Sequence, residues 1–129
     1  MASIRVLVVD DFEPFREVVR LTLAERLDLE VIGEAADGPE AVRKAVELKP
    51  DLILLDLGLP TMNGVEVARR FRQLVPDARI IFFSQESSVD LVEEARLMGV
   101  WGYVVKAKTR SHLLPTVDAV VSGKESFGS

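Results

Sequence analysis

The sequence contains no cysteine. This absence excludes disulfide bonds, thiolate catalysis and cysteine-ligated zinc or iron–sulfur sites, and it is compatible with a reducing cytosol. Basic residues are also too few to attract nucleic acid, since 21 Asp and Glu outnumber 16 Lys and Arg. We therefore expect no direct binding of this domain to a phosphate backbone.

Long hydrophobic runs are missing as well. The apolar segments, such as Leu52 to Leu55 and Ile80 to Phe83, are far shorter than the roughly 20 residues that span a bilayer. The N-terminus lacks the pattern of a secretory signal. From these absences we expect a soluble, cytoplasmic protein that does not associate with a membrane.

Short β-branched runs alternate along the chain with segments of helical period, which is typical of alternating strands and helices. With 48% hydrophobic residues over 129 positions, the chain can build one sizeable core. The predicted strands are Ile4 to Val9, Leu29 to Ala35, Leu52 to Asp56, Arg79 to Ser84 and Trp101 to Val105. The first, third and fourth are almost continuously apolar, as strands covered on both faces are.

Each predicted strand is followed by a segment with apolar residues at i, i+4 and i+7, for example Phe15, Val19 and Leu23. Five such units predict an α/β fold, namely a doubly wound five-stranded parallel sheet of the flavodoxin-like (βα)5 type with strand order 2-1-3-4-5. Residues 1–123 should form this domain and residues 124–129 a tail or the start of a linker. The Gly- and Ser-rich stretch from Ser122 to Ser129 is expected to fray.

Polar residues follow four of the predicted strands, and ligands of doubly wound sheets bind at the carboxyl ends of the strands. They are Asp10 and Asp11 after the first strand, Asp56 at the end of the third, Ser84 at the end of the fourth and Lys106 after the fifth. If the first and third strands are neighbours, three carboxylates converge. Like charges that close disfavour joint ionisation unless a cation is present.

Mg²⁺ is the cation that this pattern favours, because it uses one or two carboxylates, water and phosphate oxygens. Lys106 adds a second positive group. Carboxylates, Mg²⁺, a lysine and a hydroxyl together suit phosphoryl transfer, in which a carboxylate can itself be the acceptor. Taken singly, each residue has an ordinary interpretation: a strand-end Asp as turn-former or helix cap, Lys106 as a solvated lysine, Ser84 as a capping serine. Their conjunction at one sheet edge favours the functional interpretation.

From Val6 to about Gly123 the chain closely resembles the response-regulator receiver family. The resemblance rests on four stretches, which are VLVVDDFEPFR, LILLDLGLPTMNGVEV, IIFFSQES and GVWGYVVKAK. It implies that Asp56 is the phosphorylated residue. It further implies Mg²⁺ ligands at Asp11, at Asp10 directly or through water, and at the carbonyl of Gly58.

The same resemblance implies that Ser84 is the hydroxyl that bonds the phosphoryl group and that Lys106 is the ammonium that pairs with it. Ser84 stands where threonine is commoner in the family, but it keeps the hydroxyl. Tyr103 would be the aromatic residue whose rotamer reports the state, turning inward on phosphorylation. The face made by the fourth helix, fifth strand and fifth helix would then change and control an output.

Several details resemble the subfamily in which a receiver precedes a helix-turn-helix DNA-binding domain, so the implied output is transcription through a domain absent from these residues. The implied phosphodonor partner is a sensor histidine kinase or a histidine phosphotransfer protein. A homodimer of the phosphorylated form is a candidate assembly. The only histidine, His112, lies in the fifth predicted helix, so the chain is not itself expected to be the phosphohistidine donor.

Two other classes of function remain open on the residues alone. A Mg²⁺-dependent phosphohydrolase would carry a second Asp two residues after its nucleophile, and Gly58 occupies that place here. A phosphorylation-independent interaction module would have lost Asp56, Lys106 or one of the acidic pair, and all are present. Trp101 is expected either to pack as core or to anchor an interface.

Overall fold

The computed structural model describes residues 3–59, 62–86 and 88–127. It contains one five-stranded parallel sheet of order β2-β1-β3-β4-β5, as predicted. The strands are β1 (Ile4–Val9), β2 (Leu29–Ala35), β3 (Leu52–Asp56), β4 (Arg79–Ser84) and β5 (Gly102–Val105). The helices are α1 (Glu13–Leu23), α2 (Gly38–Leu48), α3 (Gly64–Leu74), α4 (Val89–Leu97) and α5 (Thr109–Val121), with a 3-10 turn, η1 (Lys106–Lys108), before α5.

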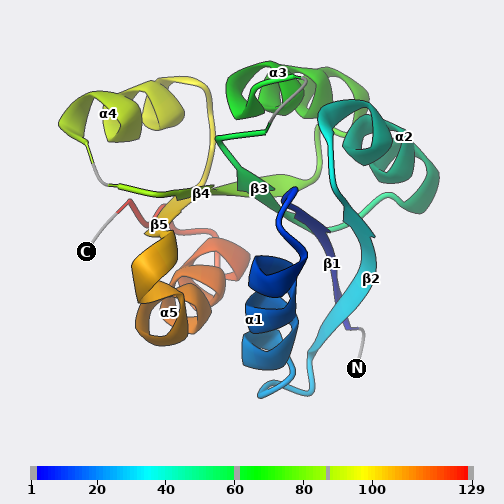
Figure 1. Ribbon diagram of the computed structural model, residues 1–129, viewed down its shortest axis with the longest axis vertical. Coiled ribbons are helices and arrows are strands. Elements are labelled where there is room, and N and C mark those ends of the chain that lie inside the picture. Colours follow the sequence, from blue (N-terminus) through cyan, green and yellow to red (C-terminus); the bar gives the residue numbers. More distant parts are fainter. Residues whose placement is uncertain (1–2, 60–61, 87, 128–129) are drawn as a thin grey trace.

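The helices cover both faces of the sheet, with α2, α3 and α4 on one side and α1 and α5 on the other (Figure 1). Successive residues of a strand point to opposite faces, so each central strand contributes side chains to two hydrophobic cores, one on each face of the sheet. In β3, Ile53 and Leu55 pack toward α2 to α4, whereas Leu52 and Leu54 pack toward α1 and α5. This two-sided burial explains why the central strands are apolar without alternation.

Helix boundaries follow local signals in the sequence. Asp37 caps α2 and Asn63 caps α3, each side chain accepting a hydrogen bond from the backbone N–H three residues later. Pro14 and Pro39 occupy first-turn positions, where a missing N–H costs nothing. Among the described residues, no helix combines the length and apolar content needed to cross a membrane.

Trp101 lies directly before β5 rather than inside it. Its backbone N–H donates to the carbonyl of Ile80 at 2.8 Å. The ring is half-buried against the α1 and α5 side of the core, and the Arg79 guanidinium lies 4.3 Å from its centroid. The packing interpretation of Trp101 is therefore the one that the contacts favour.

The segment after α5 is paired with the sheet, so the expectation that it frays is wrong for Ser126 and Phe127. The Ser126 N–H donates to the carbonyl of Trp101 at 2.9 Å, and the N–H of Tyr103 donates to the carbonyl of Ser126 at 3.0 Å. Phe127 packs on the α2 to α4 side, under the guanidinium of Arg96. Because β5 is an edge strand, its free backbone groups offer a template for this pairing. Residues 128–129 of the predicted tail lie outside the described residues.

The turn into α3 is closely packed at Gly64. The N–H of Gly64 donates to the carbonyl of Leu57 at 3.1 Å. A Cβ atom at this position would lie 2.6 Å from Cα of Leu57 and 2.8 Å from the carbonyl oxygen of Asp56. Only glycine lets the helix start so close to the end of β3, with Gly64 packed against the backbone of Asp56 and Leu57.

Replacing Gly64 by alanine should therefore lower the free energy of unfolding by about 1 to 3 kcal/mol, the usual cost of overpacking. Urea denaturation followed by circular dichroism measures this loss. Gly58→Ala is the matched control, because the nearest atom that its Cβ would meet among the described residues is Asp56 Oδ1, at 3.6 Å. Equal losses in the two variants would contradict the steric explanation.

Candidate functional site

The predicted site residues meet at the carboxyl edge of the sheet. Asp10 follows β1, Asp56 ends β3, Ser84 ends β4 and Lys106 follows β5. A cleft there is lined by Asp11, Asp56, Gly58, Ser84 and Lys106, among other residues. The sheet order brings them together because β1 lies between β2 and β3, so the Asp10–Asp11 pair and Asp56 end adjacent strands.

Three carboxylates form the centre of the cleft. One oxygen from each of Asp10, Asp11 and Asp56 lies within 4.8 Å of the others. Asp10 and Asp56 are buried, at 1% and 4% exposure, whereas Asp11 is exposed. Repulsion between the two buried carboxylates is therefore only weakly screened by water.

Asp10 is fixed by hydrogen bonds to its own turn and to β2. Its Oδ1 accepts a hydrogen bond from the N–H of Phe12 at 2.8 Å, and its N–H donates to the carbonyl of Ala35 at 3.0 Å. Burial raises the pKa of the Asp10 carboxyl above its usual value. The contact with Lys106 and the Phe12 N–H bond lower the same pKa, each with a smaller effect than burial. The nearby Asp56 carboxylate raises it slightly further.

Lys106 supplies positive charge between the two buried acids. Its Nζ lies 2.6 Å from Oδ2 of Asp10 and 3.3 Å from Oδ2 of Asp56. The ammonium also lies 4.6 Å from the centroid of the Phe15 ring, within the range of a cation–π contact. The approach to Asp10 is an ion-pair contact without hydrogen-bond angles, since Asp10 Oδ2 has no hydrogen-bond partner among the described residues.

The donor set fits a hard divalent cation. Three carboxylates converge, and the buried Oδ2 of Asp10 has an ion-pair contact with Lys106 but no hydrogen bond among the described residues. Oxygen ligands of this kind are those that Mg²⁺ prefers. Gly58 helps to orient the cluster, because its N–H donates to Oδ1 of Asp56 at 3.0 Å.

Ser84 and Tyr103 share one acceptor, the main-chain carbonyl of Glu86. The hydroxyl of Ser84 donates to it at 2.9 Å and that of Tyr103 at 3.0 Å. Tyr103 is buried, with 4% of its surface exposed. Its ring thus already lies inward in this structure, whereas the sequence led us to expect an inward turn on phosphorylation. The structure thus joins two predicted switch residues through a carbonyl that the sequence did not suggest, since any residue could supply it.

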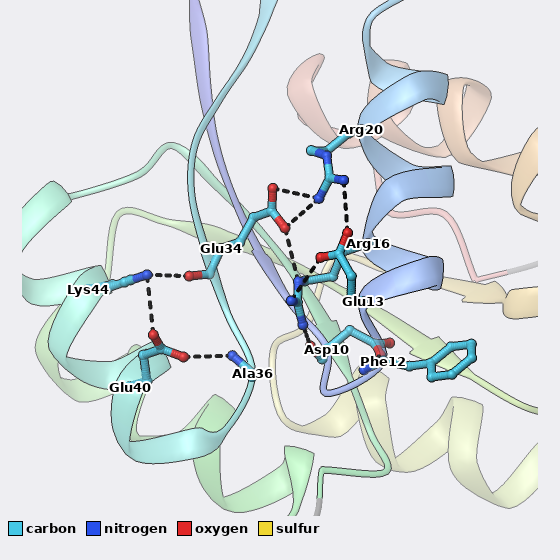
Figure 2. Close-up of polar contacts among 9 residues, drawn as sticks. All are labelled: Asp10, Phe12, Glu13, Arg16, Arg20, Glu34, Ala36, Glu40 and Lys44. Atoms are coloured by element: carbon cyan, nitrogen blue, oxygen red, sulfur yellow. Dashed lines mark hydrogen bonds and ion pairs between the residues drawn. The ribbon is translucent and has the colours of Figure 1, made fainter.

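Sequence reasoning also missed Arg16, which lies in α1 five residues after Asp11. Its Nη1 donates to the main-chain carbonyl of Asp10 at 2.5 Å, and its Nε donates to Glu34 at 2.9 Å (Figure 2). An arginine on the polar face of a helix carries no signal of its partner. The contact of Arg16 with Glu34 depends on the pairing of β1 with β2, which sets Glu34 beside Val8 and therefore near α1.

Comparison with known proteins points to one family. The family description "response regulator receiver domain" matches residues 6–118. The transcriptional regulatory protein LiaR of Bacillus subtilis is 36% identical over 126 residues, which cover 98% of this chain and 60% of LiaR. The chain therefore spans well under two thirds of the length of this curated relative.

Solved structures agree with the sequence matches. A two-component response regulator of the LuxR family from Aurantimonas sp. SI85-9A1 has a TM-score of 0.91 at 33% identity, covering 97% of this chain and 89% of that one. The signal receiver domain of the response regulator NarL from Mycobacterium tuberculosis has a TM-score of 0.88 at 31% identity, covering 96% of this chain and 100% of that one.

The crowding of acids predicts that Asp10→Asn stabilises the fold when divalent cations are absent. Because burial raises the pKa of Asp10, the folded state is penalised at neutral pH, and the penalty disappears as pH falls through the raised pKa. Asparagine removes the charge and keeps an oxygen for the Phe12 N–H. We expect a gain of about 1 kcal/mol at neutral pH, shrinking in acid.

Urea denaturation in chelator-treated buffer at several pH values measures this gain. Asp11→Asn is the matched control, because Asp11 is exposed and its replacement should change stability by no more than about 0.5 kcal/mol. A loss of stability in Asp10→Asn would mean that the ion pair with Lys106 outweighs the burial of Asp10.

Proposed function

Because this chain belongs to the response regulator receiver family, we propose that it is a phosphorylation-dependent switch in which Asp56 accepts the phosphoryl group. The observation that carries the proposal is the position of Lys106 Nζ between the buried carboxylates of Asp10 and Asp56, at 2.6 and 3.3 Å. Asp56 also lines the cleft, where a phosphodonor can reach it. An ammonium in that place attracts phosphoryl oxygens as they approach the carboxylate.

Mg²⁺ is the proposed cofactor, held by the carboxylates of Asp10, Asp11 and Asp56 and by the main-chain carbonyl of Gly58. The close carboxylate oxygens, and an Asp10 Oδ2 that accepts no hydrogen bond among the described residues, support this ligand set. When bound, Mg²⁺ supplies positive charge that offsets the acids and the phosphoryl oxygens.

In the proposed transfer, a carboxylate oxygen of Asp56 forms a bond to phosphorus while the bond from phosphorus to the donor atom breaks. The donor atom leaves with the bonding electron pair, which gives acetate when acetyl phosphate is the donor. Lys106 pairs with the phosphoryl oxygens, and the Ser84 hydroxyl donates to one of them. Slow attack by water later releases inorganic phosphate and restores Asp56, so the chain acts as a switch rather than a metabolic enzyme.

The proposed switch begins at the carbonyl of Glu86, to which Ser84 and Tyr103 both donate. A Ser84 hydroxyl that turns to a phosphoryl group on Asp56 gives up its bond to this carbonyl. The loop between β4 and α4 then rearranges, and Tyr103 remains as its inward anchor. The change reaches the face made by α4, β5 and α5.

The proposed partners follow from the phosphoryl group and from the relatives. A sensor histidine kinase or a histidine phosphotransfer protein would donate the group in the cytoplasm, and phosphorylated copies would pair as homodimers. LiaR is a transcriptional regulatory protein of which this chain covers 60%. We therefore propose that this domain, whose folded part extends to Phe127, controls transcription through a DNA-binding domain elsewhere in the protein.

A phosphohydrolase remains the competing reaction for an aspartyl phosphate. Gly58 has no side chain that could act as an acid or base two residues after Asp56. Its N–H instead donates to Oδ1 of Asp56 at 3.0 Å. The position therefore has no acid or base that could activate water, which favours the switch over a phosphohydrolase.

Incubation with acetyl phosphate and Mg²⁺ tests the phosphoacceptor. The intact mass of the wild type should rise by one phosphoryl group, and removal of Mg²⁺ by a chelator should prevent the rise. Asp56→Asn should not be labelled, whereas Asp77→Asn, an exposed acid before β4, should be labelled like the wild type. Equal labelling of Asp56→Asn and the wild type would exclude Asp56 as the acceptor.

The switch proposal makes a separate prediction for Ser84→Ala. The variant should still be labelled, because Asp56 and Lys106 remain, but labelling should no longer change amide hydrogen exchange in α4 and β5. Ser111→Ala is the control, since the exposed Ser111 hydroxyl donates to the carbonyl of Lys108 at 3.3 Å, outside the cleft. A full exchange response in labelled Ser84→Ala would count against the role of Ser84 in the switch.

A further inference from the structure

The guanidinium of Arg16 joins the acidic turn to α1 and β2. Its three nitrogens reach three different partners: Nη1 donates to the carbonyl of Asp10 at 2.5 Å, Nε to Glu34 at 2.9 Å and Nη2 to Glu13 at 3.0 Å (Figure 2). The side chain is only 15% exposed. A planar guanidinium held at three points fixes the place of the carbonyl that it contacts.

That carbonyl belongs to the peptide bond between Asp10 and Asp11, so its orientation sets both acids at once. The rest of Asp10 is also tied down, through its N–H to Ala35 and its Oδ1 to Phe12. The remaining oxygen, Oδ2, accepts no hydrogen bond among the described residues. The turn therefore presents an immobilised carboxylate oxygen at the cleft, where Lys106 Nζ lies 2.6 Å from it as an ion-pair partner.

Glu34 at the end of β2 holds Arg16 from the other side. Its carboxylate accepts from Arg16 and also from Nη1 of Arg20, at 2.7 and 2.9 Å. The main-chain carbonyl of Glu34 accepts from Nζ of Lys44 in α2 at 2.5 Å, and Lys44 pairs with Glu40 at 3.3 Å (Figure 2). Arg16 is thus supported by contacts that connect α1, β2 and α2.

We propose that Arg16 is a positioning residue for cation binding, and that Glu34 holds its guanidinium against the Asp10 carbonyl. The inference rests on the proposed binding of Mg²⁺ to the acidic cluster and deepens it. Arg16 contacts neither the cation nor the phosphodonor in this scheme. It acts by fixing the peptide bond from which two ligands project.

The charge of Arg16 and its positioning role predict opposite changes in Mg²⁺ affinity when Arg16 is replaced. A guanidinium near a divalent cation repels it, so the loss of the Arg16 charge by itself would tighten Mg²⁺ binding. Positioning predicts weaker binding, because ligands that are no longer oriented must be ordered by the cation itself. The sign of the change therefore separates the two roles.

Isothermal titration with Mg²⁺ alone, on the full chain, tests the inference. Arg16→Gln should raise the dissociation constant about tenfold, the usual effect of removing a group that orients a ligand. Arg20→Gln is the matched control, because Arg20 lies on the same helix and contacts the same carboxylates, Glu13 and Glu34, without a contact to Asp10 in the described structure. It should leave the dissociation constant near that of the wild type.

The stabilities of both variants should be measured alongside, because both lose comparable ion pairs. The rate of labelling by acetyl phosphate should fall in Arg16→Gln at low Mg²⁺ and recover as Mg²⁺ is raised, which a misfolded site would not do. If Arg16→Gln does not fold, Arg16→Lys and Arg20→Lys decide the question, since both keep the charge. Weaker Mg²⁺ binding only in the Arg16 variant supports the proposal.

Unchanged or tighter Mg²⁺ binding in Arg16→Gln would overturn the positioning role, and so would an equal loss in Arg20→Gln. If Arg16→Lys and Arg20→Lys are used instead, equal Mg²⁺ dissociation constants in these two variants would also overturn the positioning role. Failure of the proposed function looks different, since the wild type itself would then neither bind Mg²⁺ nor be labelled. The two failures are thus distinguished by the wild-type titration.

Discussion

Repulsion among the carboxylates of Asp10, Asp11 and Asp56 is the constraint on which the site depends. Asp10 and Asp56 end adjacent parallel strands, which lie about 4.8 Å apart in any sheet. The acids therefore cannot separate without breaking the pairing of β1 and β3. Relief has to come from positive charge, which Lys106 supplies between the two buried acids and which a bound cation would complete.

The sheet can hold this unfavourable charge because its strands are buried on both faces. Every residue of β3 is buried, up to and including Asp56, and residues of β1 and β3 enter both cores. Displacing Asp56 would expose apolar side chains worth about 1.5 to 3 kcal/mol each. The stability of the core thus keeps together charges that would otherwise move apart.

The sequence was sufficient to predict most of the fold, because buried strands and amphipathic helices differ in apolar period. The strand-end acids, Ser84 and Lys106 could be predicted to converge because parallel strands end at one edge. The pairing of Ser126 with Trp101 and Tyr103 could not, because backbone pairing along an edge strand leaves no mark in side-chain chemistry. The contacts of Arg16 and the shared carbonyl of Glu86 were missed for a related reason: they depend on which distant segments become neighbours and on side-chain rotamers.

The two halves of the site are built with different stiffness. On the α1 side, Asp10 is bonded through its N–H, its carbonyl and Oδ1, to β2, Arg16 and its own turn. On the α4 side, Ser84 and Tyr103 depend on one carbonyl in the loop before α4. In the proposed switch, a change of charge at Asp56 would act on both halves. In the second half, the Ser84 hydroxyl donates to the carbonyl of Glu86 and accepts from its N–H at 3.4 Å, so one rotation of this hydroxyl would release Glu86. In this proposed switch, the geometry of the cation ligands would be preserved on the Asp10 side, and rearrangement would be directed to α4 and β5 on the Ser84 side.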